Sequence, residues 1–196
     1  MFKKLIKIVS FLGHMFQKKN DLDIVLHLLK KEGHVREIAK ALNESVSTTA
    51  RRLENLKNNN IVDYNQEGKN KVFYLKKNLL TKTFILQAEQ YKKAKLLHKH
   101  PKLITIIEEI LKITNKELII LFGSYAKGLE KQGSDIDIYI ETNNKDIKEK
   151  IENIHSTINV KIGLFNKDSP LIKEIIQNHI ILRGVEVFYD KKPVSL

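Results

Sequence analysis

Two aspartates one residue apart follow a Gly-Ser pair, and residues of these types could bind a divalent metal ion and a phosphate group. Asp135 and Asp137 lie in the segment SDIDIYIE, where apolar and polar residues alternate as they do along a half-buried strand. This alternation puts both carboxylates on one face of the strand, about 7 Å apart by the rise per residue. Because like charges this close repel each other unless a cation lies between them or one carboxyl is protonated, we expect a Mg²⁺ ion there.

The Gly-Ser pair supplies groups that suit a phosphate. Gly123 and Ser124 follow the apolar run 118–122, which is typical of a buried strand, and precede a short helical segment. Gly123 has no side chain, so a ligand can approach its backbone closely, and Ser124 offers a hydroxyl where free helical N–H groups favour anions. Lys127 adds a positive charge one turn later. The two segments together therefore predict a site that binds a triphosphate and a metal ion.

The order Gly-Ser, ten residues, Asp-x-Asp resembles the G-S-x10-D-x-D signature of minimal nucleotidyltransferases of the DNA polymerase beta-like superfamily. The flanking residues agree, since LFGSYAKG is similar to the family's FGS-x-ARG, with lysine in place of the usual arginine, and GSDIDIYIE is similar to its GSDIDLLV strand. The resemblance covers residues 103–190 and implies a mixed sheet flanked by helices. It also implies Mg²⁺-dependent transfer of a nucleoside monophosphate from a nucleoside triphosphate, with ATP as the expected donor, to a hydroxyl acceptor.

The resemblance also implies roles for individual residues. Asp135 and Asp137 would be the catalytic, metal-binding residues. The nucleotide would be bound by Gly123, Ser124, Lys127 and Ser134. The acceptor hydroxyl could belong to a protein, a nucleic acid or a small molecule. Minimal nucleotidyltransferases often adenylylate a partner toxin, which favours a protein acceptor.

One feature of the family's pattern is missing. The family usually has a third carboxylate on a later strand, as a metal ligand and general base. The matching strand, 157–165, carries Asn159 and Lys161 on its outward face and no acid. We expect Lys161 at the third position, because FNKDS then falls where the next helix should begin. Since charged lysine cannot bind Mg²⁺, it would instead neutralise the aspartates, and Asp168 or Glu141 would have to serve as base.

The first half of the chain has the pattern of a winged helix-turn-helix. Helical periodicity over 21–32, 34–42 and 46–60 is followed by two short strands joined by the turn QEGKN. This order resembles the DNA-binding domain of many prokaryotic regulators, and it implies double-stranded DNA as a partner. The residues expected to contact DNA are Ser47, Thr48, Arg51 and Arg52 on the third helix, with Lys69 and Lys71 at the hairpin tip.

The charge distribution supports this division. Residues 1–100 carry 21 Lys and Arg against 9 Asp and Glu, whereas residues 101–196 carry 14 of each, so the net charge of +12 lies wholly in the first half. The first half therefore has the electrostatics of a polyanion-binding domain. A winged helix used for protein contact is the alternative.

We therefore expect an α+β protein. Its predicted parts are an amphipathic helix at 1–20, a winged helix-turn-helix at 21–78, a linker helix at 79–100 and a nucleotidyltransferase-like domain with a mixed sheet at 101–196. The first helix would pack on the next domain or form a homodimer contact, with peripheral membrane binding as the alternative. No apolar run is long enough to span a membrane, and the absence of cysteine fits the cytoplasm.

Two functions remain open at this point. The first is an ATP-dependent nucleotidyltransferase that is brought to DNA, or regulated, by its winged helix. The second is a DNA-binding transcriptional regulator whose degenerate second domain binds a nucleotide or a partner without turnover. The intact Gly-Ser and Asp-x-Asp pair favours the enzyme, and the missing third acid favours the regulator.

Overall fold

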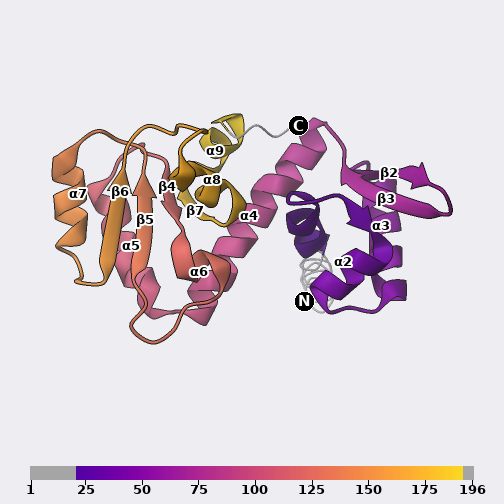
Figure 1. Cartoon of the computed structure of the whole chain (residues 1–196), viewed down its shortest axis with the longest axis horizontal. Coiled ribbons are helices and arrows are strands. Elements are labelled where there is room, and N and C mark those ends of the chain that lie inside the picture. Colours follow the sequence, from indigo (N-terminus) through magenta and orange to yellow (C-terminus); the bar gives the residue numbers. More distant parts are fainter. Residues whose placement is uncertain (1–20, 192–196) are drawn as a thin grey trace, which may run out of the picture. The chain divides into compact units, whose positions relative to one another are not determined.

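The computed structural model describes residues 21–191, which form two compact units (Figure 1). The division falls after Tyr91, within helix α4 (Leu79–Lys99). The amphipathic helix expected at residues 1–20, and the dimer contact assigned to it, lie outside the described residues. Within residues 21–191, every helix is too short or too polar to cross a membrane.

The first unit consists of helices followed by a β-hairpin. Residues 21–28 are helical, and after them come β1 (Gly33–His34), α2 (Val35–Leu42), α3 (Val46–Asn58), β2 (Val62–Glu67) and β3 (Asn70–Leu75). The strands form an antiparallel sheet in the order β1-β3-β2. Three helices and a final hairpin in this order make a winged helix-turn-helix, which confirms the fold expected for this half of the chain.

Local hydrogen bonds fix the turn between α2 and α3. Asn43 adopts a left-handed conformation (φ 53°, ψ 46°) that ends α2. Ser45 caps α3, because its hydroxyl accepts the N–H of Thr48 at 3.1 Å. Glu44, inside the turn, accepts a hydrogen bond from the Arg52 guanidinium at 2.8 Å. These contacts hold the start of α3 against the end of α2.

The second unit is a four-stranded sheet with helices on both faces (Figure 1). After α4 its elements are α5 (Lys102–Ile113), β4 (Ile119–Leu121), α6 (Gly123–Lys127), β5 (Ile136–Ile140), α7 (Lys145–Glu152), β6 (Ile158–Ile162), α8 (Pro170–Gln177), β7 (Ile180–Arg183) and α9 (Val185–Lys191). The strand order is β6-β5-β4-β7. Of the strand pairs among residues 21–191, β5–β6 is parallel and the other two of this sheet are antiparallel, so the sheet is mixed, as expected.

The two faces of this sheet bury different side chains. On one face, Ile138 and Val160 lie in an apolar cluster with Ile107 of α5. On the opposite face, Tyr139 packs against Phe165 with the ring centroids 6.3 Å apart. Because side chains alternate along a strand, the odd-numbered residues of β5 all point to this second face. The candidate site is built on the same face.

Candidate functional site

The carboxylate of Asp137 lies directly against the Gly-Ser turn. A Cβ atom placed on Gly123 would be only 2.1 Å from Asp137 Oδ2. Gly123 also has φ +68°, in the left-handed region that favours glycine. The backbone joins the two segments as well, since the Phe122 N–H donates to the Asp137 carbonyl at 3.0 Å. The structure thus brings the Gly-Ser turn and the acidic strand together, although 14 positions separate Gly123 from Asp137 in the chain.

The acidic pair has the properties of a divalent cation site. Asp135 is exposed and Asp137 is half-buried. Within the described part of the chain, neither carboxylate takes part in an ion pair with lysine or arginine. Carboxylate oxygens are the ligands that Mg²⁺ prefers, and Mg²⁺ commonly takes one or two of them together with substrate phosphates. The two side chains therefore fit a nucleotide-bound Mg²⁺ ion.

The position of the expected third acid is occupied by Asn159. In the parallel β5–β6 pair, Asp137 lies opposite Asn159, and Asn159 Nδ2 donates to Asp137 Oδ1 at 2.8 Å. Lys161 lies opposite Tyr139 and is exposed, so the expectation that Lys161 holds the third position is wrong. Among residues 21–191, no group of three His, Cys, Asp or Glu side chains could hold a metal ion.

The alternative bases considered from the sequence are engaged or exposed elsewhere. Glu141 binds the Lys191 ammonium and accepts the Phe165 N–H at 3.3 Å. Asp168 is exposed in the loop between β6 and α8. The Tyr139 hydroxyl donates to a backbone carbonyl at 2.9 Å, and burial raises the pKa of Tyr139 above its ordinary value, so it stays protonated.

The remaining predicted nucleotide-binding residues differ in how they are held. Ser124 is half-buried at the start of α6. Lys127, at the end of α6, donates to Glu174 Oε1 of α8 at 2.7 Å. Ser134 accepts the Lys131 N–H at 2.8 Å, so its hydroxyl oxygen helps to close the loop before β5. Lys127 and Ser134 thus already have protein partners, which a nucleotide would have to replace or share.

We expect Glu174→Gln to raise the affinity for ATP by up to about fivefold, since an exposed ion pair contributes up to about 1 kcal/mol. The pair is well exposed, with 36% of the Lys127 side chain and 42% of the Glu174 side chain accessible, so Lys127 can leave it at little cost. Lys127→Met should have the opposite effect. Titration of ATP in the presence of Mg²⁺ measures both. Lys173→Met, on the same helix as Glu174, is the control. A loss of ATP affinity there equal to that of Lys127→Met would contradict a specific role for Lys127.

A second ion pair holds the loop that follows α6. Glu130, whose side chain is only 7% exposed, binds the Lys99 ammonium and lies 3.0 Å from His100 Nε2. The hydrogen bond from Lys99 lowers the pKa of Glu130. The His100 ring packs edge-on against Tyr125, with the centroids 5.3 Å apart. These contacts tie α6 and its loop to the end of α4. No local pattern in the sequence predicts them.

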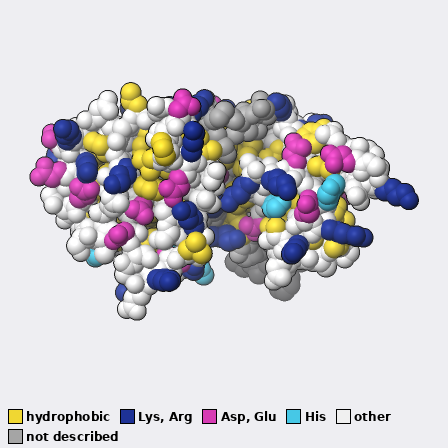
Figure 2. All heavy atoms as spheres, viewed as in Figure 1, with side chains coloured by type: hydrophobic (Ala, Val, Ile, Leu, Met, Phe, Trp, Pro, Cys, Tyr) yellow, Lys and Arg dark blue, Asp and Glu magenta, His cyan; other side chains and the backbone are white. Residues whose placement is uncertain are grey.

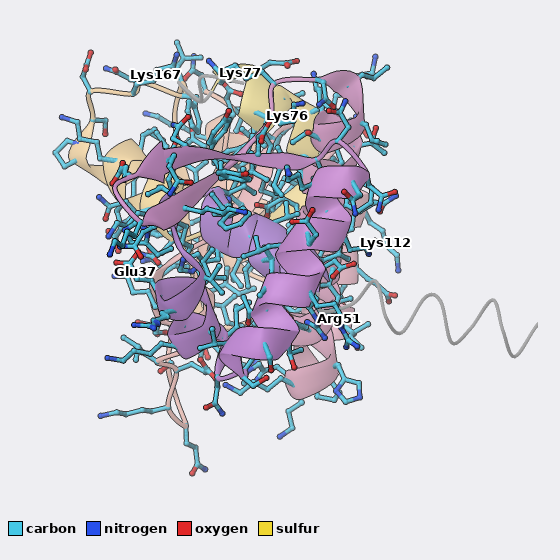
Figure 3. All side chains as sticks on the ribbon, turned by 90° about the vertical axis from the view of Figure 1, so that its right-hand side faces the viewer. Glu37, Arg51, Lys76, Lys77, Lys112 and Lys167 are labelled. Carbon is cyan, nitrogen blue, oxygen red and sulfur yellow. The ribbon has the colours of Figure 1, made fainter. Side chains whose placement is uncertain are left out.

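On α3, the residues expected to contact DNA divide into two groups. Ser47 and Arg51 are exposed, and Figure 3 shows Arg51 on the side of the molecule that carries α3. Thr48 is half-buried, and its hydroxyl accepts a hydrogen bond from Ser45. Arg52 is paired with Glu44 and only 17% of its side chain is exposed, so its expected place on the outward face is wrong. Arg52 instead lies on the side of α3 that faces the α2–α3 turn, where Glu44 is.

The hairpin gathers lysines around an aromatic ring. Lys69 is exposed at the tip. The Lys71 ammonium lies 4.3 Å from the centroid of the Tyr64 ring, and the Lys57 ammonium, from α3, lies 5.0 Å from the same centroid. Lys57 was not among the predicted DNA-contacting residues. By contrast, acidic and basic side chains are interspersed over the visible face of the second unit (Figure 2).

Comparisons with known proteins bear on the second unit. Residues 100–183 match the family model of the nucleotidyltransferase domain. MJ1215 of Methanocaldococcus jannaschii is 36% identical over 83 residues, which are 35% of this chain and 93% of that protein. MJ1379 of the same organism is 35% identical over 95 residues, which are 44% of this chain and 89% of that protein. Both relatives are assigned as protein adenylyltransferases.

A solved structure resembles the first half of the chain. It is the homodimeric winged helix-turn-helix DNA-binding domain of Mb0332 from Mycobacterium bovis, with 23% identity and a TM-score of 0.36, covering 50% of this chain and 90% of that one. For the second half, the family model matches the segment that carries the Gly-Ser turn and the acidic strand, and the chain covers about nine-tenths of each of the two relatives. The chain therefore belongs to the nucleotidyltransferase family.

Proposed function

We propose that this protein transfers a nucleoside monophosphate, AMP from ATP, to a hydroxyl group of a protein, and that its winged helix binds double-stranded DNA. The observation that carries the enzymatic part is the position of the Asp137 carboxylate against Gly123. At this point a nucleotide could contact the phosphate-binding turn and the acidic strand at once. The assignment of both relatives as protein adenylyltransferases supports the choice of donor and acceptor.

Each residue of the site would have a separate role in binding the metal ion or the nucleotide. Mg²⁺, held by Asp135 and Asp137, would neutralise charge on the phosphates. Gly123 leaves room for the triphosphate, while Ser124 and Lys127 would donate hydrogen bonds to it. In the transfer itself, the acceptor oxygen forms a bond to the α-phosphorus while the bond to the bridging oxygen breaks and pyrophosphate leaves.

The acceptor hydroxyl must lose its proton during the transfer, so a group is needed that accepts this proton. In the described part of the chain, no third acid joins Asp135 and Asp137 in a group that could hold a metal ion, and Asn159 cannot accept a proton at neutral pH. The proton would therefore pass to water or to a group that the acceptor itself brings. Catalysis by this chain would then rest on positioning and charge neutralisation.

A labelled-ATP experiment tests the enzymatic part. The full chain is incubated with α-labelled ATP and Mg²⁺, together with a cell lysate, DNA or no addition, beside the double variant Asp135→Ala/Asp137→Ala. We expect label on a protein with the wild type only. If ATP binds without Mg²⁺ and no label is transferred, the second candidate function holds, a DNA-binding regulator without turnover. Asn159 at the third position is the observation that favours it.

The DNA-binding part rests on the exposed face of α3 and on the net charge of the first half. Arg51 and Ser47 are exposed near the start of α3, where side chains of a recognition helix reach base edges and phosphates. Lys57, Lys71 and Lys69 would contact the backbone from the end of α3 and the hairpin. A homodimer would place two such helices on paired half-sites.

We expect Arg51→Ala and Arg52→Ala to have different effects. Arg51→Ala should weaken duplex binding by about 1–3 kcal/mol and leave thermal stability unchanged, because its side chain is exposed. Arg52→Ala should lower the free energy of unfolding by about 1–3 kcal/mol, because Glu44 loses its partner. Fluorescence anisotropy with a labelled duplex and thermal unfolding measure the two effects. Wild-type DNA affinity in Arg51→Ala would contradict the role given to α3.

A further inference from the structure

We infer that Asn159 limits the site to one divalent ion, the one that accompanies the nucleotide. The domain would then bind the metal–nucleotide complex but transfer the nucleoside monophosphate slowly. The inference rests on the proposed function. It concerns the residue that lies next to Asp137 on the neighbouring strand.

The two carboxylate oxygens of Asp137 face different neighbours. Oδ1 accepts the Asn159 amide at 2.8 Å, and Oδ2 faces the backbone of Gly123. A carboxylate that bridges two metal ions has to offer one oxygen to each. The Asn159 amide takes one lone pair of Oδ1 and competes there with a metal ion, so Asp137 offers a metal ion mainly Oδ2, on the side of the Gly-Ser turn. This arrangement suits a single ion bound together with the nucleotide.

The charge of the site also favours a single divalent ion. Two divalent ions about 3.5–4 Å apart repel each other strongly, and sites of this kind offset the repulsion with several anionic ligands. Here the described residues supply the carboxylates of Asp135 and Asp137 and no third acid beside them. Asn159 has the shape of an aspartate without its charge, so the protein groups carry one negative charge fewer than a site with three acids.

The next outward-facing residue of β6 does not compensate for the missing acid. Lys161, two residues further along the same face of β6, is exposed and lies opposite Tyr139 rather than Asp137. It therefore neither replaces the missing ligand nor neutralises Asp137 by direct contact. This makes Lys161 a matched control position, because an acid introduced there lies on the same strand and face but not next to Asp137.

The experiment counts bound Mn²⁺ by electron paramagnetic resonance, using the full chain saturated with an ATP analogue whose α–β bridge cannot be cleaved. We expect one Mn²⁺ per chain for the wild type, two for Asn159→Asp and one for Lys161→Asp. The rate of AMP transfer should rise at least about tenfold in Asn159→Asp, because a carboxylate base typically contributes 10²–10⁴-fold. Thermal unfolding without metal supplies a second readout: Asn159→Asp should be less stable than the wild type, and Mn²⁺ should restore its stability.

The outcomes separate this inference from the proposed function. Two Mn²⁺ ions in the wild type, or one in a folded Asn159→Asp, overturn the inference and leave the proposed function standing. No nucleotide-dependent Mn²⁺ in the wild type overturns both. If Asn159→Asp does not fold, the wild-type count alone decides, since one ion supports the inference and two refute it.

Discussion

Replacing Gly123 with alanine is expected to lower the rate of AMP transfer at least about 100-fold. The added Cβ would lie 2.1 Å from Asp137 Oδ2 and 3.0 Å from its Cγ, whereas ordinary contacts begin near 3.4 Å. Asp137 would have to move by about 1 Å, and a displacement of that size in a reacting site typically costs about two orders of magnitude in rate. Single-turnover transfer from labelled ATP measures the loss.

The chain offers a matched control for this substitution. Gly128 has φ +69°, almost the same as the +68° of Gly123, but nothing lies within 4 Å of the Cβ that an alanine would add there. Gly128→Ala therefore carries the backbone strain, about 1–2 kcal/mol, without the contact with the acidic strand. It should lower thermal stability and leave transfer close to the wild-type rate. Equal losses of activity in the two variants would show that strain, and not the contact with Asp137, explains the effect.

Asp137→Asn is expected to reduce transfer by about 10³-fold while leaving the fold intact. The substitution keeps the size of the side chain but removes the negative charge that a divalent ion needs. Its effect on metal-free stability should be small, because relief of the repulsion with Asp135 offsets the weaker hydrogen bond with Asn159. Active sites commonly hold like charges close together at some cost in stability.

Two measurements check this second prediction. Labelled-ATP transfer gives the loss of activity, and thermal unfolding in EDTA gives the stability. Asp168→Asn is the control, because Asp168 is an exposed acid that the sequence also offered as a base. If Asp168→Asn removes transfer and Asp137→Asn does not, the site has been placed on the wrong acid.

The elements that carry the site could be predicted from the sequence because their signals are local. The segment KLITIIEEILKI has apolar residues at helical spacing and forms α5 over the same residues, Lys102–Ile113. The alternation in SDIDIYIE predicts β5 and its buried face, on which Ile136, Ile138 and Ile140 lie. The mixed sheet and the winged helix-turn-helix, both expected from resemblance, are confirmed.

What the sequence could not supply were the pairings over long separations. The register of β5 and β6 places Asn159 beside Asp137, 22 residues away, and the sequence pattern is equally compatible with a shift of two, which would favour Lys161. A shift of two keeps the same side chains on the same face, so alternation cannot tell these registers apart. Lys127 and Glu174 are 47 residues apart, and no local sequence pattern predicts their ion pair either.

The side chains of α3 that face outward were predicted incorrectly in part, for a different reason. Successive residues of a helix differ by about 100° in direction, so neighbouring positions at the edge of a face are easily exchanged. Thr49 is buried although it is polar, whereas the apolar residues Ala50 and Val46 are exposed, Val46 to 47%. Arg52 accordingly turns toward Glu44 and away from the outward face.

Calorimetric titration of ATP into the full chain, with Mg²⁺ and then with EDTA, tests most directly whether the acidic strand and the phosphate-binding turn together bind a metal–nucleotide complex. We predict binding with Mg²⁺ that disappears in EDTA and is lost in Asp137→Asn. Equal ATP affinity with and without Mg²⁺, or undiminished affinity in Asp137→Asn, would contradict the account.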